Sequence, residues 1–265
     1  MTDEIINIRK NVEIKKPLIH CITNPISING CANTILSVGA KPIMAEHPKE
    51  VCEITEASDA LMLNIGNITD ARMESIKLSL KTAKEKEIPA LLDVVGIACS
   101  KLRRMYVTEL LKTSVPSVIK GNYSEIEALY NAQYHSPGVD AEASLNVGDI
   151  TKSAKELALE YHTVILATGK TDIITDGTKV FYVKNGTSQL ASVTGTGCML
   201  GSLCTAFMAS LNPVDATVTA CCYFGICGEM AQTHKGNGSF MVNLMDKLST
   251  LNKEEILKHM NMEEK

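Results

Sequence analysis

The sequence contains no Trp, and its 265 residues include only seven Tyr and four Phe. Lys and Arg number 26 against 30 Asp and Glu, so the net charge is −4 with His neutral, and no basic block of five or more residues occurs. Nucleic-acid binding requires a basic footprint, and binding to single strands usually adds aromatic stacking. We therefore expect no nucleic-acid partner.

The nine cysteines include no CxxC pair, and their odd number argues against a closed set of disulfides. Residues 1–17 are charged throughout and lack the apolar segment of a secretory signal. We therefore expect a cytoplasmic protein with reduced thiols. Most of the cysteines should be small buried apolar residues, because their spacing does not suit a metal site.

A membrane span is also lacking. Residues 199–231 are nearly uncharged, but Asn212, Pro213 and Asp215 interrupt them. A transmembrane helix needs about 20 predominantly apolar residues. Two close-packed buried helices explain this segment better, with Pro213 in the first turn of the second helix. We expect no membrane partner.

Short apolar runs alternate with longer helical patterns. The runs predict strands at 17–22, 42–45, 60–65, 89–93, 117–120 and 163–167, and the spacing between them predicts helices at 28–38, 70–86, 124–130 and 150–161. Residues 134–147 are predicted to form a surface excursion. Later, a hairpin is predicted at 172–184 around Asp176–Gly177, then a turn at Asn185–Gly186 and a strand at 191–194.

This alternation predicts an α/β fold in one domain over residues 1–265. A central, mostly parallel sheet should have helices on both faces and a few late antiparallel strands. Ligands of open α/β sheets bind beyond the carboxyl ends of the strands. The residues at those predicted ends are small or polar, and we take them as a candidate site: Asn24, Met44, Asn64, Gly66, Asn67, Asp93, Lys120, Gly121, Asn122, Thr168 and Gly169.

A glycine loop, Val193-Thr194-Gly195-Thr196-Gly197-Cys198, stands directly before an apolar helical segment. Glycines allow a tight turn, and the unpaired N–H groups of a helix start can form an anion site. Cys198 would lie at that helix start, where the dipole favours a thiolate. The alternative is a plain turn whose Cys packs inward. The loop is neither a Rossmann fingerprint, because Leu200 stands where the third Gly is needed, nor a Walker A loop.

Three further features allow both a chemical and a structural interpretation. Asn122 and Glu125 have the spacing of a capping box, but Glu125 could also hold a Mg²⁺–phosphate group beside Lys120. Asp93 ends an apolar run and could be a metal ligand, a base or a turn residue. Thr168 could contact nucleotide phosphates or simply begin a turn. The six histidines have no HxxxH or HExxH spacing, and His20 and His47 are predicted to be structural or surface residues.

Several motifs follow one another in order along the chain: Ile22-Thr23-Asn24, Cys31-Ala32-Asn33, residues 39–45, residues 60–66, Leu92-Asp93, Lys120-Gly121-Asn122 with Glu125, Ala167-Thr168-Gly169 and residues 194–201. Taken together, they resemble the hydroxyethylthiazole kinases of the ribokinase-like superfamily over nearly the whole chain. The ordered set is more specific than any one motif, and Cys198 in the glycine loop is typical of thiazole kinases, since most other relatives carry Asp there.

The resemblance implies a three-layer ribokinase-like fold and ATP-dependent phosphorylation of the hydroxyl of 4-methyl-5-(2-hydroxyethyl)thiazole, in thiamine biosynthesis or salvage. It also implies Mg²⁺ as cofactor, ATP as co-substrate and a homotrimer with thiazole sites at subunit interfaces. The roles implied by position are ATP binding for Lys120, Asn122 and Thr168; thiazole binding for Asn24, Met44, Gly195 and Cys198; Mg²⁺ binding for Asp93 and Glu125; and a catalytic anion hole from Gly195, Thr196, Gly197 and Cys198.

The sequence departs from the family pattern in a few places. Residues 94–99 read Val-Val-Gly-Ile-Ala-Cys where Pro-Val-Gly-Val-Gly-Ala is usual, Gly66-Asn67 stands where Gly-Thr is common, and Lys120 often corresponds to Arg. Lys keeps the charge but loses the bidentate fork of Arg. Two other functions remain open: a ribokinase-like kinase for a hydroxymethylpyrimidine or a sugar, and a non-catalytic sensor with the same fold.

Overall fold

The computed structural model describes residues 2–131, 133–134 and 145–265. Its strands are β1 (Leu18–Ile22), β2 (Lys41–Ile43), β3 (Ala60–Asn64), β4 (Ala90–Asp93), β5 (Val118–Asn122), β6 (Val164–Thr168), β7 (Asp172–Thr175), β8 (Val180–Val183) and β9 (Met262–Glu264). Its helices are α1 (Thr2–Lys15), α2 (Ile28–Ser37), α3 (Val51–Glu56), α4 (Asp70–Glu85), α5 (Lys101–Thr113), α6 (Tyr123–Tyr130), α7 (Val147–Tyr161), α8 (Ser188–Ala191), α9 (Thr196–Met208), α10 (Pro213–Ala231), α11 (Asn237–Thr250) and α12 (Lys253–His259).

The described strands form one nine-stranded sheet in the order β2-β1-β3-β4-β5-β6-β7-β8-β9. The pairs from β2 to β6 are parallel, and β7, β8 and β9 join antiparallel. The predicted mixed sheet is therefore confirmed. Every residue of β3 is buried, as expected for a parallel strand that is covered on both faces.

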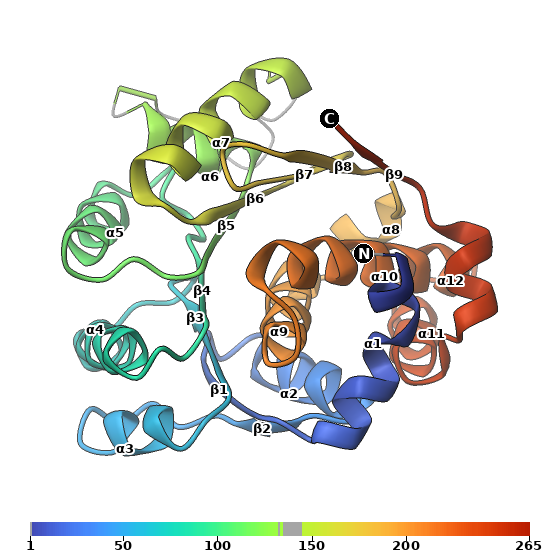
Figure 1. Ribbon diagram of the computed structural model, residues 1–265, viewed down its shortest axis with the longest axis horizontal. Coiled ribbons are helices and arrows are strands. Elements are labelled where there is room, and N and C mark those ends of the chain that lie inside the picture. Colours follow the sequence, from blue (N-terminus) through green and yellow to red (C-terminus); the bar gives the residue numbers. More distant parts are fainter. Residues whose placement is uncertain (1, 132, 135–144) are drawn as a thin grey trace.

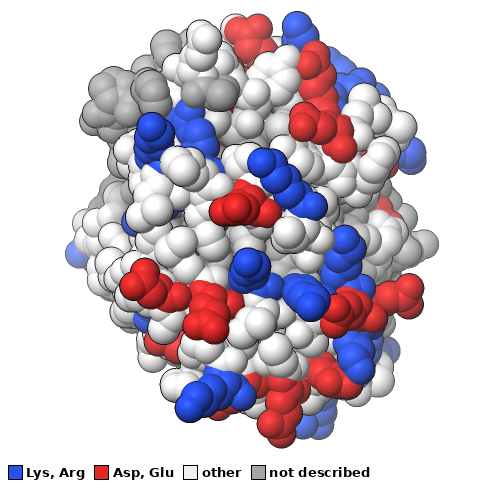
Figure 2. Space-filling model, turned by 90° about the vertical axis from the view of Figure 1, so that its left-hand side faces the viewer, with Lys and Arg blue, Asp and Glu red and all other residues white. Residues whose placement is uncertain are grey.

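Helices cover both faces of the sheet and make three layers (Figure 1). α3, α4, α5, α6 and α7 lie on one side, and α1, α2, α9, α10, α11 and α12 lie on the other. Each side has its own apolar core against the sheet. On the face formed by α3, α4 and α5, basic and acidic side chains are interspersed among uncharged residues (Figure 2). That face therefore presents no extended patch of one sign.

The uncharged segment 199–231 forms α9 and α10, which pack against each other as predicted. Asn212 caps α10 through a hydrogen bond to the N–H of Asp215, and Pro213 occupies the first turn. No helix in the described ranges is long and apolar enough to cross a membrane.

Residues 191–194 do not form the predicted strand. α8 ends at Ala191, and the chain then turns into the glycine loop. The side of β8 where another strand could add is occupied by β9. Asn237 donates instead to the backbone oxygen of Ser192, so side chains satisfy this segment in place of a strand ladder.

Other predictions are confirmed with small shifts. The hairpin turns at Asp176–Gly177, where Gly177 has a φ of 92°. β2 ends at Ile43, two residues earlier than predicted, and α7 begins at Val147, three residues earlier than predicted. His20 is buried and bonded to Thr55 Oγ1 and Ala45 O, and His47 is exposed. Most of the predicted surface excursion, residues 135–144, lies outside the described residues.

Candidate active site

The register of the parallel strands places the predicted site residues side by side at one rim of the sheet. Asn64 is the cross-strand partner of Asp93, and Asp93 is the partner of Lys120. Asn122 is paired with Thr168 in the same way. The carboxyl ends of β3, β4, β5 and β6 therefore form one continuous row of polar side chains, as the strand pattern predicted.

Lys120 and Asp93 form a buried ion pair. Lys120 Nζ lies 2.9 Å from Asp93 Oδ2, and the side chains are 5% and 1% exposed. Burial raises the pKa of Asp93, against the opposing effects of Lys120 and Asn64. Burial alone would lower the pKa of Lys120, but the Asp93 carboxylate raises it above its usual value. Lys120 therefore carries a positive charge at this rim.

The second carboxylate oxygen of Asp93 has no partner among the described residues: Oδ1 is buried and accepts no hydrogen bond. An unpaired buried acceptor costs about 1 to 3 kcal/mol. A cation with oxygen ligands would remove that cost. The orphaned oxygen is thus an observation that fits the predicted role of Asp93 in binding Mg²⁺.

Glu125 is the other predicted metal ligand, and it is also a capping residue. Asn122 N donates to Glu125 Oε2 at 2.8 Å, and Glu125 N donates to Asn122 Oδ1 at 2.8 Å, which confirms the capping box. Gly96 N donates to Glu125 Oε1 at 2.7 Å. Burial and the neighbouring Asp93 raise the pKa of Glu125, and these backbone donors oppose the increase.

Asp93 and Glu125 together are a two-carboxylate set. Within the described ranges, no group of three or more His, Cys, Asp or Glu side chains is arranged to hold a metal ion. Mg²⁺ typically uses one or two carboxylates and completes its shell with water and substrate phosphates. The donor set therefore fits Mg²⁺ better than a cation that needs a complete protein cage.

The glycine loop lies beside Lys120. Gly195 has a φ of 93° and precedes the first turn of α9, a conformation that L-residues rarely adopt. A Cβ placed on Gly197 would lie 3.8 Å from Lys120 Nζ. Thr196 Oγ1 donates back to the oxygens of Leu190 and Val193, so its side chain holds the loop in shape. The helix start and a buried cation thus face the same space, which favours an anion there.

Cys198 is joined to the polar row through two asparagines. Asn24 Nδ2 lies 3.4 Å and Asn64 Nδ2 lies 3.3 Å from Cys198 Sγ. Asn64 Nδ2 also donates to Asp93 Oδ2 at 3.2 Å, and Asn64 Oδ1 accepts from Asn24 and from Gly66 N. The sequence placed Asn64 at a strand end without assigning it a role. Its position within the apolar run 60–65 was the available signal, and in the structure the residue is 1% exposed.

Two predicted binding residues lie farther along the rim. Thr168 Oγ1 donates to Gly121 O at 3.4 Å, which holds the end of β6 against β5 near Lys120 and Asn122. Met44 directly follows β2, the outermost strand beside β1, and packs against the apolar core on the side of the sheet that carries α2 and α9. The structure therefore brings Asn24, Asp93, Lys120, Glu125, Thr168 and the glycine loop to one rim, with Met44 at its outer end.

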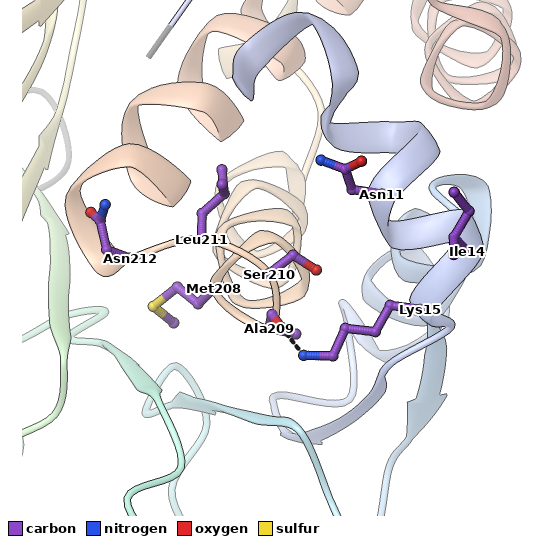
Figure 3. Close-up of a pocket in the computed structure, with 8 residues that line it drawn as sticks. All are labelled: Asn11, Ile14, Lys15, Met208, Ala209, Ser210, Leu211 and Asn212. Carbon is purple, nitrogen blue, oxygen red and sulfur yellow. Dashed lines mark hydrogen bonds between the residues drawn. The ribbon is translucent and has the colours of Figure 1, made fainter. Parts of the chain in front are cut away.

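A surface cavity of about 550 Å³ lies at the other end of α9 (Figure 3). It is lined by residues 11, 14 and 15 of α1, by Met208 at the end of α9 and by residues 209–212 between α9 and α10. Lys15 Nζ donates there to the backbone oxygen of Ala209. This cavity is separate from the polar row, because α9 begins at the rim and ends at the cavity.

The chain is similar to known proteins over nearly its whole length. Residues 9–254 match the Hydroxyethylthiazole kinase family. A hydroxyethylthiazole kinase 2 of Clostridium botulinum (strain Hall) is 47% identical over 256 residues, covering 95% of this chain and 97% of the relative. The solved structure of a hydroxyethylthiazole kinase from Pyrococcus horikoshii OT3 superposes with a TM-score of 0.90 at 35% identity, covering 99% of both chains.

A ribokinase-like superfamily protein from Enterococcus faecalis shares the fold, with a TM-score of 0.63 at 11% identity over 91% of this chain and 89% of that one. The three-layer ribokinase-like architecture expected from the sequence is thereby confirmed. The match of the family model and the close relatives leads to one conclusion: the chain belongs to the hydroxyethylthiazole kinase family.

Proposed function

We propose that this protein transfers the γ-phosphoryl group of ATP to the primary hydroxyl of 4-methyl-5-(2-hydroxyethyl)thiazole, with the product entering thiamine synthesis or salvage. The observation that carries this proposal is the convergence of Lys120, Asp93 and the glycine loop at one rim of the sheet. The rim combines a fixed positive charge, a helix start and two carboxylates. Phosphoryl transfer depends mainly on such positioning and electrostatics.

The roles of the residues follow from their places. Lys120 would neutralise phosphate oxygens, and Asn122 and Thr168 would position the nucleotide beside it. The N–H groups of residues 195–198 would stabilise charge on the transferring phosphoryl group. In the reaction, the alcohol oxygen bonds to the γ-phosphorus, the bond between that phosphorus and the β–γ bridging oxygen breaks, and the alcohol proton leaves. Cys198, as its thiolate, would accept that proton and become a thiol.

Asp93 and Glu125 would hold Mg²⁺. When bound, Mg²⁺ neutralises phosphate charge and orients the phosphates. Asn24, Met44, Gly195 and Cys198 would contact the thiazole alcohol. A thiazole site at a subunit interface in a homotrimer follows from the resemblance. Ile26, which is 73% exposed two residues after Asn24, supports an apolar contact there. We also place the protein in the cytoplasm, consistent with its nine free thiols.

The decisive experiment measures ADP release from Mg²⁺-ATP with a panel of alcohols. The panel contains the thiazole alcohol, a hydroxymethylpyrimidine and a sugar, and thiazole phosphate is identified by mass spectrometry. We expect ADP release that depends on the thiazole and matches the phosphate formed. Release that depends on another alcohol would support a different ribokinase-like kinase, and no release with any alcohol alongside ATP binding would support a sensor.

A further inference from the structure

The turn between β6 and β7 carries Thr168 and is held by contacts that the proposed chemistry does not use. Thr168 begins the turn, and Asp172 begins β7. Gly169 N donates to Asp172 Oδ1 at 3.1 Å, which closes the turn on itself. The hydroxyl of Tyr123 donates to the backbone oxygen of Thr171, which fixes the end of the turn that leads into β7.

The ring of Tyr123 also packs against the turn, at Gly169. A Cβ on Gly169 would lie 2.7 Å from Tyr123 Cζ and 2.8 Å from Cε1, distances that real Cβ atoms essentially never show. Gly169 is not among the residues with a positive φ. The glycine is therefore required here by the close approach of the ring and not by its backbone conformation.

The position of Tyr123 links this turn to the charged part of the rim. Tyr123 is the first residue of α6, follows the capping residue Asn122 directly and is 6% exposed. Asn122 is bonded to Glu125 and is paired across the sheet with Thr168. One buried side chain thus touches the turn after Thr168 and belongs to the helix start that holds Asn122 and Glu125.

We propose that Tyr123 is a positioning residue for the nucleotide: its ring and hydroxyl fix the position of residues 168–171 relative to Lys120 and Asn122. This inference rests on the proposed function, because it requires Thr168 to contact ATP. Tyr123 itself touches none of the reacting atoms. Its loss should therefore affect ATP binding more than turnover or thiazole binding.

The first test compares two hydroxyl deletions. Tyr123→Phe keeps the ring and removes the bond to Thr171 O. Tyr106→Phe is a matched control, because Tyr106 is buried in the same helical layer and donates to a backbone oxygen, that of Met73, at 2.6 Å. We expect Tyr123→Phe to raise the KM for ATP about fivefold, which corresponds to one typical hydrogen bond. The kcat and the KM for thiazole should change less than twofold, and Tyr106→Phe should change none of the three.

A double-mutant cycle tests the contact with the ring. Gly169→Ala should raise the KM for ATP when Tyr123 is present, because the new methyl group meets the ring. In a Tyr123→Leu background the same substitution should have a clearly smaller effect. Equal effects in both backgrounds would overturn the proposal. So would an unchanged KM for ATP in Tyr123→Phe with a loss of melting temperature equal to that in Tyr106→Phe.

Equilibrium binding of Mg²⁺-ATP by calorimetry separates this inference from the proposed function. If the wild type binds ATP but phosphorylates no thiazole, and Tyr123→Phe binds ATP about fivefold more weakly, then the positioning role stands and the proposed substrate is wrong. If the wild type phosphorylates thiazole and Tyr123→Phe binds ATP equally well, then the positioning role is wrong and the proposed function stands. A wild type that binds no ATP contradicts both.

Discussion

Lys120 and Asp93 are joined by a contact of 2.9 Å that is almost completely removed from solvent. Breaking such a pair from one side leaves a buried charge without a partner. The pair therefore connects the charge of the proposed phosphate site to the stability of the sheet. Removal of Lys120 should affect both.

Lys120→Met should lower the free energy of unfolding by about 3 to 5 kcal/mol, because Asp93 would stay buried without its cation. Urea denaturation measures this loss. Lys184→Met is the control: Lys184 pairs with Glu263, but both side chains are substantially exposed, and such pairs contribute about 0 to 1 kcal/mol. The double variant Lys120→Met with Asp93→Asn should recover part of the loss. Equal, small losses in both single variants would contradict the prediction.

Asn64→Ala should reduce kcat or the apparent affinity for Mg²⁺ by about 10- to 100-fold, as is usual when a side chain that orients a metal ligand is lost. The substitution removes the bonds of Asn64 to Asp93 and to Cys198. Asn33→Ala is the control, because the side chain of Asn33 donates to Asn29 within α2, away from the polar row. Steady-state kinetics over a range of Mg²⁺ concentrations give both values. Wild-type kinetics in Asn64→Ala would show that this link is dispensable.

Cys198→Ser should lower kcat while ATP still binds, because a serine hydroxyl, unlike a thiol, does not ionise near neutral pH and so supplies no anion to accept the alcohol proton. General-base catalysis contributes about 100-fold or more, so a loss of at least about 10-fold is expected if Cys198 accepts the proton. Cys52→Ser, which changes an exposed cysteine, should leave the rate unchanged. An unchanged kcat for Cys198→Ser at neutral pH would exclude the base role.

Glu125→Gln should raise the Mg²⁺ concentration required for half-maximal activity. A matched control exists in α12, where Asn252 and Glu255 form a capping box of the same type. Glu255→Gln should lower stability through weaker capping and leave the Mg²⁺ requirement unchanged. If Glu125→Gln lowers only the melting temperature, then Glu125 acts only as a cap.

The stability of the protein should fall as the pH rises from about 4 to about 6, in part because of Asp172. Burial raises the pKa of Asp172 to about 6, against the opposing effects of Gly169 N–H and Lys120. Across this window the native state binds a proton that the unfolded chain has released, so the free energy of unfolding decreases with pH. About two pH units correspond to at most roughly 3 kcal/mol.

Asp172→Asn should flatten that part of the profile, which urea denaturation at several pH values measures. Asp176→Asn should have the opposite effect on the pH profile, because it removes a contribution to the free energy of unfolding that increases with pH. Burial opposes the effect at Asp176, but hydrogen bonds from Thr178 and Lys179 hold its pKa below the usual value. Asp176 therefore adds stability that is lost as the pH falls. Profiles for both variants that parallel the wild type would contradict these assignments.

Much of the fold could be predicted because its signals are local. Apolar runs marked the parallel strands, Asp176–Gly177 marked the hairpin, and Asn212–Pro213 marked the break between α9 and α10. The prediction of a strand at 191–194 was wrong because the preference of Val193 and Thr194 for strands is weak compared with tertiary context. β9, from the far end of the chain, occupies the place beside β8.

The site was predictable in outline, because parallel strands bring their carboxyl ends to one rim. The bonds of Asn64 to Asp93 and Cys198 were not, since they join residues separated by 29 and 134 positions in the sequence. The unpartnered oxygen of Asp93 is likewise a property of three-dimensional packing. The family and the kinase class followed from ordered motifs and are confirmed by the comparisons. The individual roles of the site residues stay predictions.

The burial of α9 has a consequence for hydrogen exchange. Every residue from Met199 to Met208 is buried, between the sheet on one side and α2 and α10 on the other. Amides in such a helix exchange with deuterium only when the surrounding core opens. The first turn, with Gly197 and Cys198, is anchored on this slowly exchanging segment. The start of α9, where we propose that phosphate binds, should therefore keep its shape without ligand. Substrate binding should change the exchange of the turn at 168–171 more than that of the helix.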